Sequence, residues 1–175
     1  MIGLMLQSIM IFNFYSSKSQ IPVFPVRNMT LLGFGDDNLI FLDYEFSYMN
    51  LIAASISVLL GIVMTQSGFD KLFNWEGELD FITSKFSKTP LANFSTFGLI
   101  QVTIFEVLSG LLSLLGALMV LFYDEKSYGI IGLLLAAASL SILMLGQRIS
   151  KDYEGAAVLV PYYILTMFGL FVYAS

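Results

Sequence analysis

The chain has 175 residues, of which 57% are hydrophobic and only 12% charged, and its net charge at pH 7 is −5. A soluble domain carries about 25% charged residues, so this chain has too few polar side chains to cover a water-soluble globule of its size. The negative charge argues against nucleic acid as a partner, and the absence of cysteine and histidine argues against disulfides, thiol redox chemistry and a haem or zinc site built by this chain alone.

Residues 1–48 form an N-terminal extension with no single clear pattern. The first 15 residues are apolar, yet they are short for a membrane span and lack the basic start of a signal peptide. Pro22 and Pro25 exclude a regular helix across them, and residues 33–37 carry the glycines and aspartates typical of a turn. Residues 38–46 mix aromatic and acidic side chains, which favours a place at a membrane surface. The extension is therefore either an interfacial arm or an arm that docks on a partner subunit.

Four apolar runs follow, and each is long enough to cross a bilayer as a helix, which takes about 20 residues. They cover about residues 49–68, 95–122, 128–147 and 155–174. The short connection after the second run makes the second and third helices antiparallel neighbours. We therefore predict an all-α fold: an integral membrane four-helix bundle in residues 49–175, preceded by the N-terminal extension 1–48.

The loops predict how the bundle is oriented. Between the first two runs, Leu79, Ile82 and Phe86 have helical spacing, which predicts a short amphipathic helix on the membrane surface. Loops 69–94 and 148–154 lie at one end of the bundle and hold most of the bases, whereas the opposite turn holds one; the bases of the two loops are Lys71, Lys85, Lys88, Arg148 and Lys151. Because lysine and arginine are retained on the cytoplasmic side, we predict that both loops are cytoplasmic, that the C-terminus lies outside, and that the membrane is a plasma (inner) membrane.

Glu106 lies about ten residues into the second run, which is otherwise uncharged from Leu99 to Phe122. An acid at mid-span costs about 2.5–3.5 kcal/mol, so its carboxylate must face other helices rather than lipid. Helical spacing puts it on a stripe of small and hydroxyl-bearing residues, which are Thr103, Ser109, Gly110 and Ser113. The sequence therefore predicts a polar site inside the bundle.

The candidate partners of Glu106 lie at the base-rich end of the bundle. Lys71 follows the first run and Arg148 follows the third, and long basic side chains can reach inward from there. We predict an intramembrane cluster that joins Glu106 to Lys71 or Arg148, and its expected lining is Gln66, Gln147 and Tyr162. The cluster is either a protonated or ion-paired lock between helices, or a polar pocket for a head group, a quinone ring or a proton. No metal site is expected, since no acidic cluster has calcium-loop spacing, and the sequence identifies no catalytic residue.

Small residues let membrane helices approach closely. We interpret the glycines of the spans as packing notches rather than as a phosphate-binding loop; they are Gly61, Gly68, Gly110, Gly116 and Gly132.

Two stretches of the sequence, the end of the first apolar run (residues 61–72) and the middle of the second (residues 106–116), resemble motifs of the DoxX-like family of four-helix bacterial membrane proteins. The first is similar to the family pattern "G…F…SG…KL" and the second to "E…GG…LLLG"; the residues that carry them are Gly61, Gly68, Lys71, Leu72, Glu106, Gly110 and Gly116. The resemblance covers about residues 49–174 and implies a subunit of a bacterial or archaeal plasma membrane. One relative is the membrane subunit of a thiosulfate:quinone oxidoreductase, which implies a place near quinone chemistry. Another branch is similar to proteins that assist maturation of methylamine dehydrogenase. That role depends on cysteine chemistry, which this cysteine-free chain cannot perform alone.

From these observations we expect a non-catalytic integral membrane subunit of a larger complex, of respiratory or redox type. Its expected partners are other integral membrane proteins and lipid. We expect no cofactor bound by this chain alone, and a quinone or a lipid is the ligand left open. The alternative is a quinone-linked oxidoreductase component or a small-molecule carrier, in which Glu106 accepts a proton and Arg148 or Lys71 holds an anionic group. A transporter fits less well, because four spans without paired broken helices do not match that architecture.

Overall fold

The computed structural model describes residues 32–41 and 44–175. Its elements are β1 (Leu32–Phe34), β2 (Asn38–Phe41), β3 (Tyr44–Ser47), α2 (Tyr48–Phe73), α3 (Trp75–Phe86), the short 3-10 helix η2 (Ala92–Phe94), α4 (Ser95–Tyr123), α5 (Ser127–Ile149) and α6 (Tyr153–Ala174). Within the described residues, four helices are long and apolar enough to cross a membrane, namely α2, α4, α5 and α6. The predicted all-α four-helix bundle is confirmed, and its helices are those of a multi-pass membrane protein.

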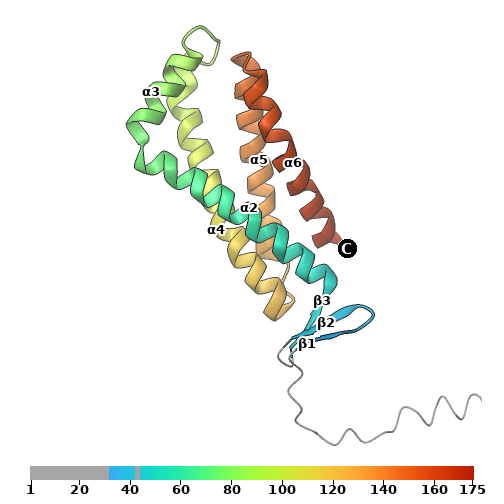
Figure 1. The fold of residues 1–175 in the computed structure, drawn as a ribbon. Coiled ribbons are helices and arrows are strands. Elements are labelled where there is room, and N and C mark those ends of the chain that lie inside the picture. Colours follow the sequence, from blue (N-terminus) through green and yellow to red (C-terminus); the bar gives the residue numbers. More distant parts are fainter. Residues whose placement is uncertain (1–31, 42–43) are drawn as a thin grey trace, which may run out of the picture.

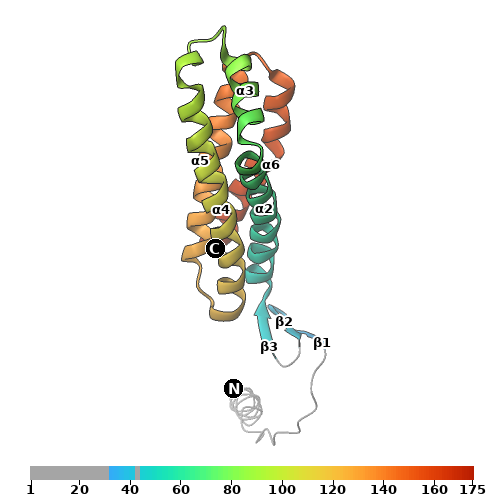
Figure 2. The ribbon, with the colours of Figure 1, turned by 90° about the vertical axis from the view of Figure 1, so that its left-hand side faces the viewer.

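The four long helices run alternately up and down (Figures 1 and 2). Helix α2 leads from the sheet to α3 at the far end, α4 returns, α5 runs back up, and α6 descends to the C-terminus. Helix α4 packs along α2 and α5, and α6 packs along α5 and α2, which closes the bundle. Loops 69–94 and 148–154 therefore lie together at one end, and the 123–127 turn lies at the other. The side of the membrane that each end faces stays a prediction.

The helices extend a few residues beyond the predicted spans, and specific backbone features end them. Asn74 separates α2 from α3, so the predicted amphipathic helix begins at Trp75 rather than at Leu79. Helix α4 ends where Asp124 adopts a left-handed conformation with φ 54°. The Asn50 side chain donates to Asp124 Oδ1 at 2.8 Å, which helps to hold this uncommon conformation.

The strands were not predicted from the sequence. β1, β2 and β3 form an antiparallel sheet in that order, with Leu39 opposite Phe46. The turn predicted at residues 33–37 joins β1 to β2, and the Gly35 N–H donates to the Asn38 carbonyl at 2.8 Å. The Phe46 ring meets the Phe122 ring of α4 edge to face, with centroids 6.1 Å apart, so the sheet packs on the end of the bundle. The predicted arm also includes residues 1–31, which lie outside the described residues.

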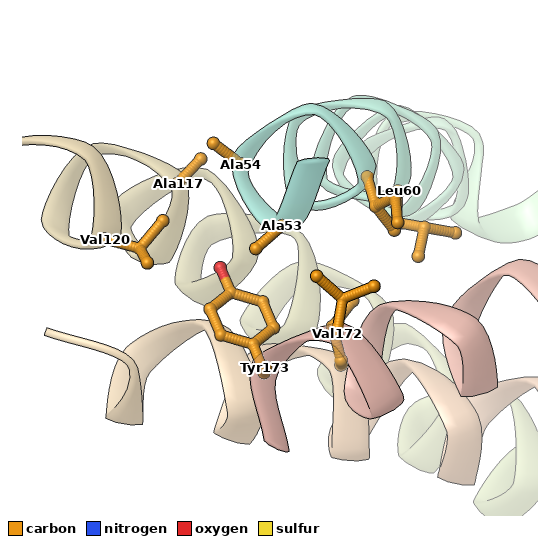
Figure 3. Packing of buried hydrophobic residues seen from close by; sticks show 9 residues of the cluster. Ala53, Ala54, Leu60, Ala117, Val120, Val172 and Tyr173 are labelled. Carbon is orange, nitrogen blue, oxygen red and sulfur yellow. The ribbon is translucent and has the colours of Figure 1, made fainter. Parts of the chain in front are cut away.

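Small and hydroxyl-bearing side chains occupy much of the interior of the bundle, beside buried leucines such as Leu60 and Leu133, while many large apolar side chains point outward. Figure 3 shows Tyr173 of α6 among small residues of α2 and α4, of which Ala53, Ala54, Ala117 and Val120 are labelled, with Val172 beside it on α6. The Tyr173 hydroxyl forms a buried hydrogen bond with the Ser57 hydroxyl, with the oxygens 2.9 Å apart. On α4 the exposed face instead carries Ile104, Leu108 and Leu111. This arrangement suits a bilayer, where close packing rather than burial of apolar area drives association.

Candidate functional site

Glu106 lies inside the bundle on α4, with only 1% of its side chain exposed. Lys71 Nζ, from the last turn of α2, lies 2.9 Å from Glu106 Oε2, and the Ser67 hydroxyl donates to Oε1 at 3.2 Å. Lys71 also donates to the Ser67 hydroxyl at 2.9 Å. The Lys71–Glu106 contact is an ion pair rather than a well-aligned hydrogen bond, because Oε2 has no hydrogen-bond partner of good geometry among the described residues. These contacts join α2 to α4 through opposite charges.

Glycines bring α2 and α4 close enough for this contact. A Cβ at Gly68 would lie 2.6 Å from Val107 Cγ2 and 3.3 Å from Glu106 Cβ, so α4 occupies the space that a side chain would need. One turn along α4, a Cβ at Gly110 would fall on the backbone of Thr65, and Gly61 faces Leu114 in the same way. The glycine notches therefore set the helix separation that lets Lys71 reach Glu106.

The polar stripe predicted on α4 faces the interior. Its members are all buried within the described structure: Thr103, Glu106, Ser109, Gly110 and Ser113. Thr103 and Ser109 donate to backbone carbonyls of their own helix, from Leu99 and Glu106. Gly116 and Gly132, also predicted as notches, lie at the α4–α5 contact, where a Cβ would fall on Gly129 and Ser113. The stripe thus serves helix packing over most of its length.

The other residues of the predicted cluster lie elsewhere. Arg148, the alternative base, is exposed and stands over the Tyr153 ring, 5.4 Å from its centroid. Its position in the last turn of α5 lies on the outer surface of the bundle, away from Glu106. Gln66 is exposed on α2, and Tyr162 packs between the apolar clusters of the bundle. Of the two bases considered, the structure brings Lys71 to Glu106.

Gln147 belongs to a second polar contact at the same end of the bundle. Lys85 Nζ, in the last turn of α3, donates to Gln147 Oε1 at 2.5 Å and to Asp152 Oδ2 at 2.6 Å. Asp152 also caps α6, because its Oδ1 accepts from the Gly155 N–H at 2.9 Å. Sequence reasoning missed Lys85, Asp152 and Ser67. Only Asp152 carried a local signal, since an aspartate directly before the start of a helix is a common N-cap.

A cavity of about 400 Å³ lies between these two polar contacts. It is bounded by α3, the first turns of α4 and the last turns of α5. Apolar side chains form most of its wall, among them Phe81, Ile82, Phe86, Phe94, Phe97, Leu99, Val102, Ile142 and Leu145, and its polar lining comes mainly from Lys71, Glu78, Lys85 and Gln147. The volume lies within the range of small-molecule sites, which are mostly apolar with a few placed polar groups.

We expect the Lys85–Asp152 contact to weaken in acid. The Lys85 ammonium and the Gly155 N–H, both donating to Asp152, hold the pKa of that carboxyl below its usual value of about 3.9. Because the pKa of Asp152 is lower in the folded state than in the unfolded state, the contact stabilises the protein fully at pH values above the unfolded-state pKa. This stabilisation is lost as the pH falls through the folded-state pKa. Asp152→Asn should therefore lower the thermal midpoint at neutral pH, and the difference from wild type should shrink below about pH 4.

Thermal unfolding in detergent at several pH values measures this difference. Glu154→Gln, which alters an exposed acid two residues away, is the matched control and should show no such convergence. A wild-type-to-Asp152→Asn difference that stays constant down to pH 3 would contradict the assignment.

Comparisons with protein-family models, with curated proteins and with solved structures found no match for this chain. The resemblance to DoxX-like proteins therefore stays a prediction. It depends on two spacings in the sequence, that of Gly68 and Lys71 and that of Glu106, Gly110 and Gly116.

Proposed function

We propose that this chain is a non-catalytic, DoxX-like membrane subunit of a larger membrane complex of respiratory or redox type. Its partners on this proposal are other integral membrane proteins and lipid of a bacterial plasma membrane. The chain would supply a rigid membrane platform, and the chemistry of the complex would belong to the partner subunits.

The buried Lys71–Glu106 pair is the observation that supports this role. A buried charge is expensive, and here the protein's own α2 supplies both the counter-ion and a hydroxyl. The carboxylate is thereby engaged within the chain instead of being offered to a substrate. Buried ion pairs are best attested as devices that specify register, and this one fixes how α2 lies against α4.

Purification at native expression level tests the proposal. The full chain, tagged at its C-terminus, is extracted from its host membrane in mild detergent and analysed by native electrophoresis and quantitative mass spectrometry. We expect a particle that contains another integral membrane protein in fixed stoichiometry. The same tag on an unrelated four-span protein controls for non-specific capture. A monodisperse particle that contains this chain alone would refute the role of subunit.

A second candidate function is favoured by the cavity. Because Lys71 lines it while pairing with Glu106, a ligand there would lie beside the buried acid. This supports a quinone-linked component or a small-molecule carrier that uses Glu106 as a proton acceptor. On this alternative, Glu106→Gln abolishes quinone-dependent activity of the parent membrane while the protein is still inserted at wild-type level. Unchanged activity in that variant would rule the alternative out.

A further inference from the structure

The cavity beneath α3 has an amphiphilic lining that includes two lysines, Lys71 and Lys85. They differ in whether an N–H group of the ammonium is left for a ligand. Lys71 is occupied, since it donates to the carbonyl and the hydroxyl of Ser67 and forms an ion pair with Glu106. Lys85 donates to Gln147 and Asp152, which leaves one of the three N–H groups of its ammonium for a further acceptor. Glu78 lines the same cavity, and its carboxylate makes no ion pair with any described residue.

The spacing of Glu78 and Lys85 sets what kind of head group fits. They are seven residues apart on α3, which places them two turns, or about 10 Å, apart along one face of the helix. A head group with an anionic and a cationic end spans that distance with one charge-assisted hydrogen bond at each end. A purely anionic head group would instead meet Glu78 as a like charge. Both lysines that line the cavity are already paired with an acid behind its wall, Lys71 with Glu106 and Lys85 with Asp152, so the Glu78 charge is the one in the lining that no described residue balances.

The apolar part of the cavity fits a hydrocarbon chain. Leu99 and Val102 of α4 are buried at its floor, while Phe94 and Phe97 are exposed, at 62% and 65%. Gly98 lies between the two pairs, and a Cβ built on it would meet no atom within 4 Å. The cavity is therefore open along the start of α4, where the surface of a membrane helix meets lipid.

We propose that this cavity binds one phospholipid whose head group carries both a phosphate and a primary ammonium, as in phosphatidylethanolamine. The ammonium donates to Glu78, the phosphate accepts from Lys85, and an acyl chain lies over Gly98 against Leu99 and Val102. This proposal is independent of the proposed function, since a lipid can bind here whether or not the chain belongs to a complex.

Native mass spectrometry of the purified full chain in detergent tests the head-group preference. Dioleoyl phosphatidylethanolamine and dioleoyl phosphatidylglycerol share their acyl chains and differ in the ammonium. We expect the ethanolamine lipid to bind with one molecule per chain and about tenfold more tightly, the effect of one charge-assisted hydrogen bond. Glu78→Gln should remove this preference. Glu76→Gln, the same change at an exposed acid of α3 outside the cavity, should keep it. Equal binding of both lipids, or a preference that survives in Glu78→Gln, overturns the proposal.

A second variant tests the place of the acyl chain without disturbing the fold. Gly98→Leu puts a side chain into open space in the cavity, so the thermal midpoint should not fall, while phosphatidylethanolamine binding should weaken at least about tenfold. Gly98→Ala, which fills less of the cavity, should retain most of the binding. Wild-type binding in a stably folded Gly98→Leu overturns the proposal. So does competition by soluble glycerophosphoethanolamine at the same concentrations as the lipid, since it lacks acyl chains.

Discussion

Lys71→Met should destabilise the protein by about 3–5 kcal/mol, because it leaves the carboxylate of Glu106 buried without its counter-ion. Glu106→Gln should cost less, about 1–2 kcal/mol, although it breaks the same contact. The asymmetry follows from burial. The Lys71 side chain is 14% exposed at the end of α2 and can extend toward water, whereas the Glu106 side chain is 1% exposed and cannot.

The double variant Lys71→Met/Glu106→Gln should be more stable than Lys71→Met alone. In a double-mutant cycle we expect a coupling energy of about 1.5–3 kcal/mol between the two residues. Reversible unfolding in mixed micelles, followed by circular dichroism, measures all the variants on one scale. Lys88→Met removes an exposed lysine of the same loop and should change stability little. Additive effects of Lys71→Met and Glu106→Gln would mean that the pair does not hold α2 against α4.

Overpacking a helix contact costs about 1–3 kcal/mol, and we expect Gly116→Ala to destabilise the protein by an amount near the upper end of this range. At this point α4 and α5 touch through their backbones, and a Cβ on Gly116 would fall on the N and Cα atoms of Gly129. Backbone atoms cannot rotate away as a side chain can, so one methyl group must push the two helices apart. Thermal unfolding in detergent measures the loss.

Gly98→Ala on the same helix is the matched control. Because a Cβ there meets no atom within 4 Å, this variant should be more stable than wild type by about 0.5 kcal/mol, the usual gain when alanine replaces glycine in a helix. Equal effects at Gly98 and Gly116 would show that helix propensity, and not the close approach of α4 to α5, determines the outcome.

The helical part of the fold could be predicted because long apolar runs and short polar loops leave few alternatives. Glu106 could be placed inside for the same reason, since a carboxylate on the lipid face has no partner. The choice between Lys71 and Arg148 could not be made, because both end a helix at the same end of the bundle. Which base reaches Glu106 depends on the rotation of α5 about its own axis, and that rotation is set by how α5 packs against its neighbouring helices.

The features that were missed depend on contacts far apart in the sequence or on weak local patterns. Lys85 and Asp152 are separated by 67 positions, and neither is unusual where it stands. Strands β1–β3 have three or four residues each, too short for an alternating pattern to stand out.

The unequal lengths of the helices have a consequence for the membrane. Helix α4 has 29 residues and is roughly 44 Å long, while α6 has 22 residues and is roughly 33 Å long. An average hydrocarbon region is about 30 Å thick, so α4 must tilt or project several ångströms beyond α6. Such hydrophobic mismatch costs a fraction of a kcal/mol per ångström and grows as the bilayer thins. We therefore expect this protein to respond to bilayer thickness, and thicker membranes should accommodate α4 with less tilt.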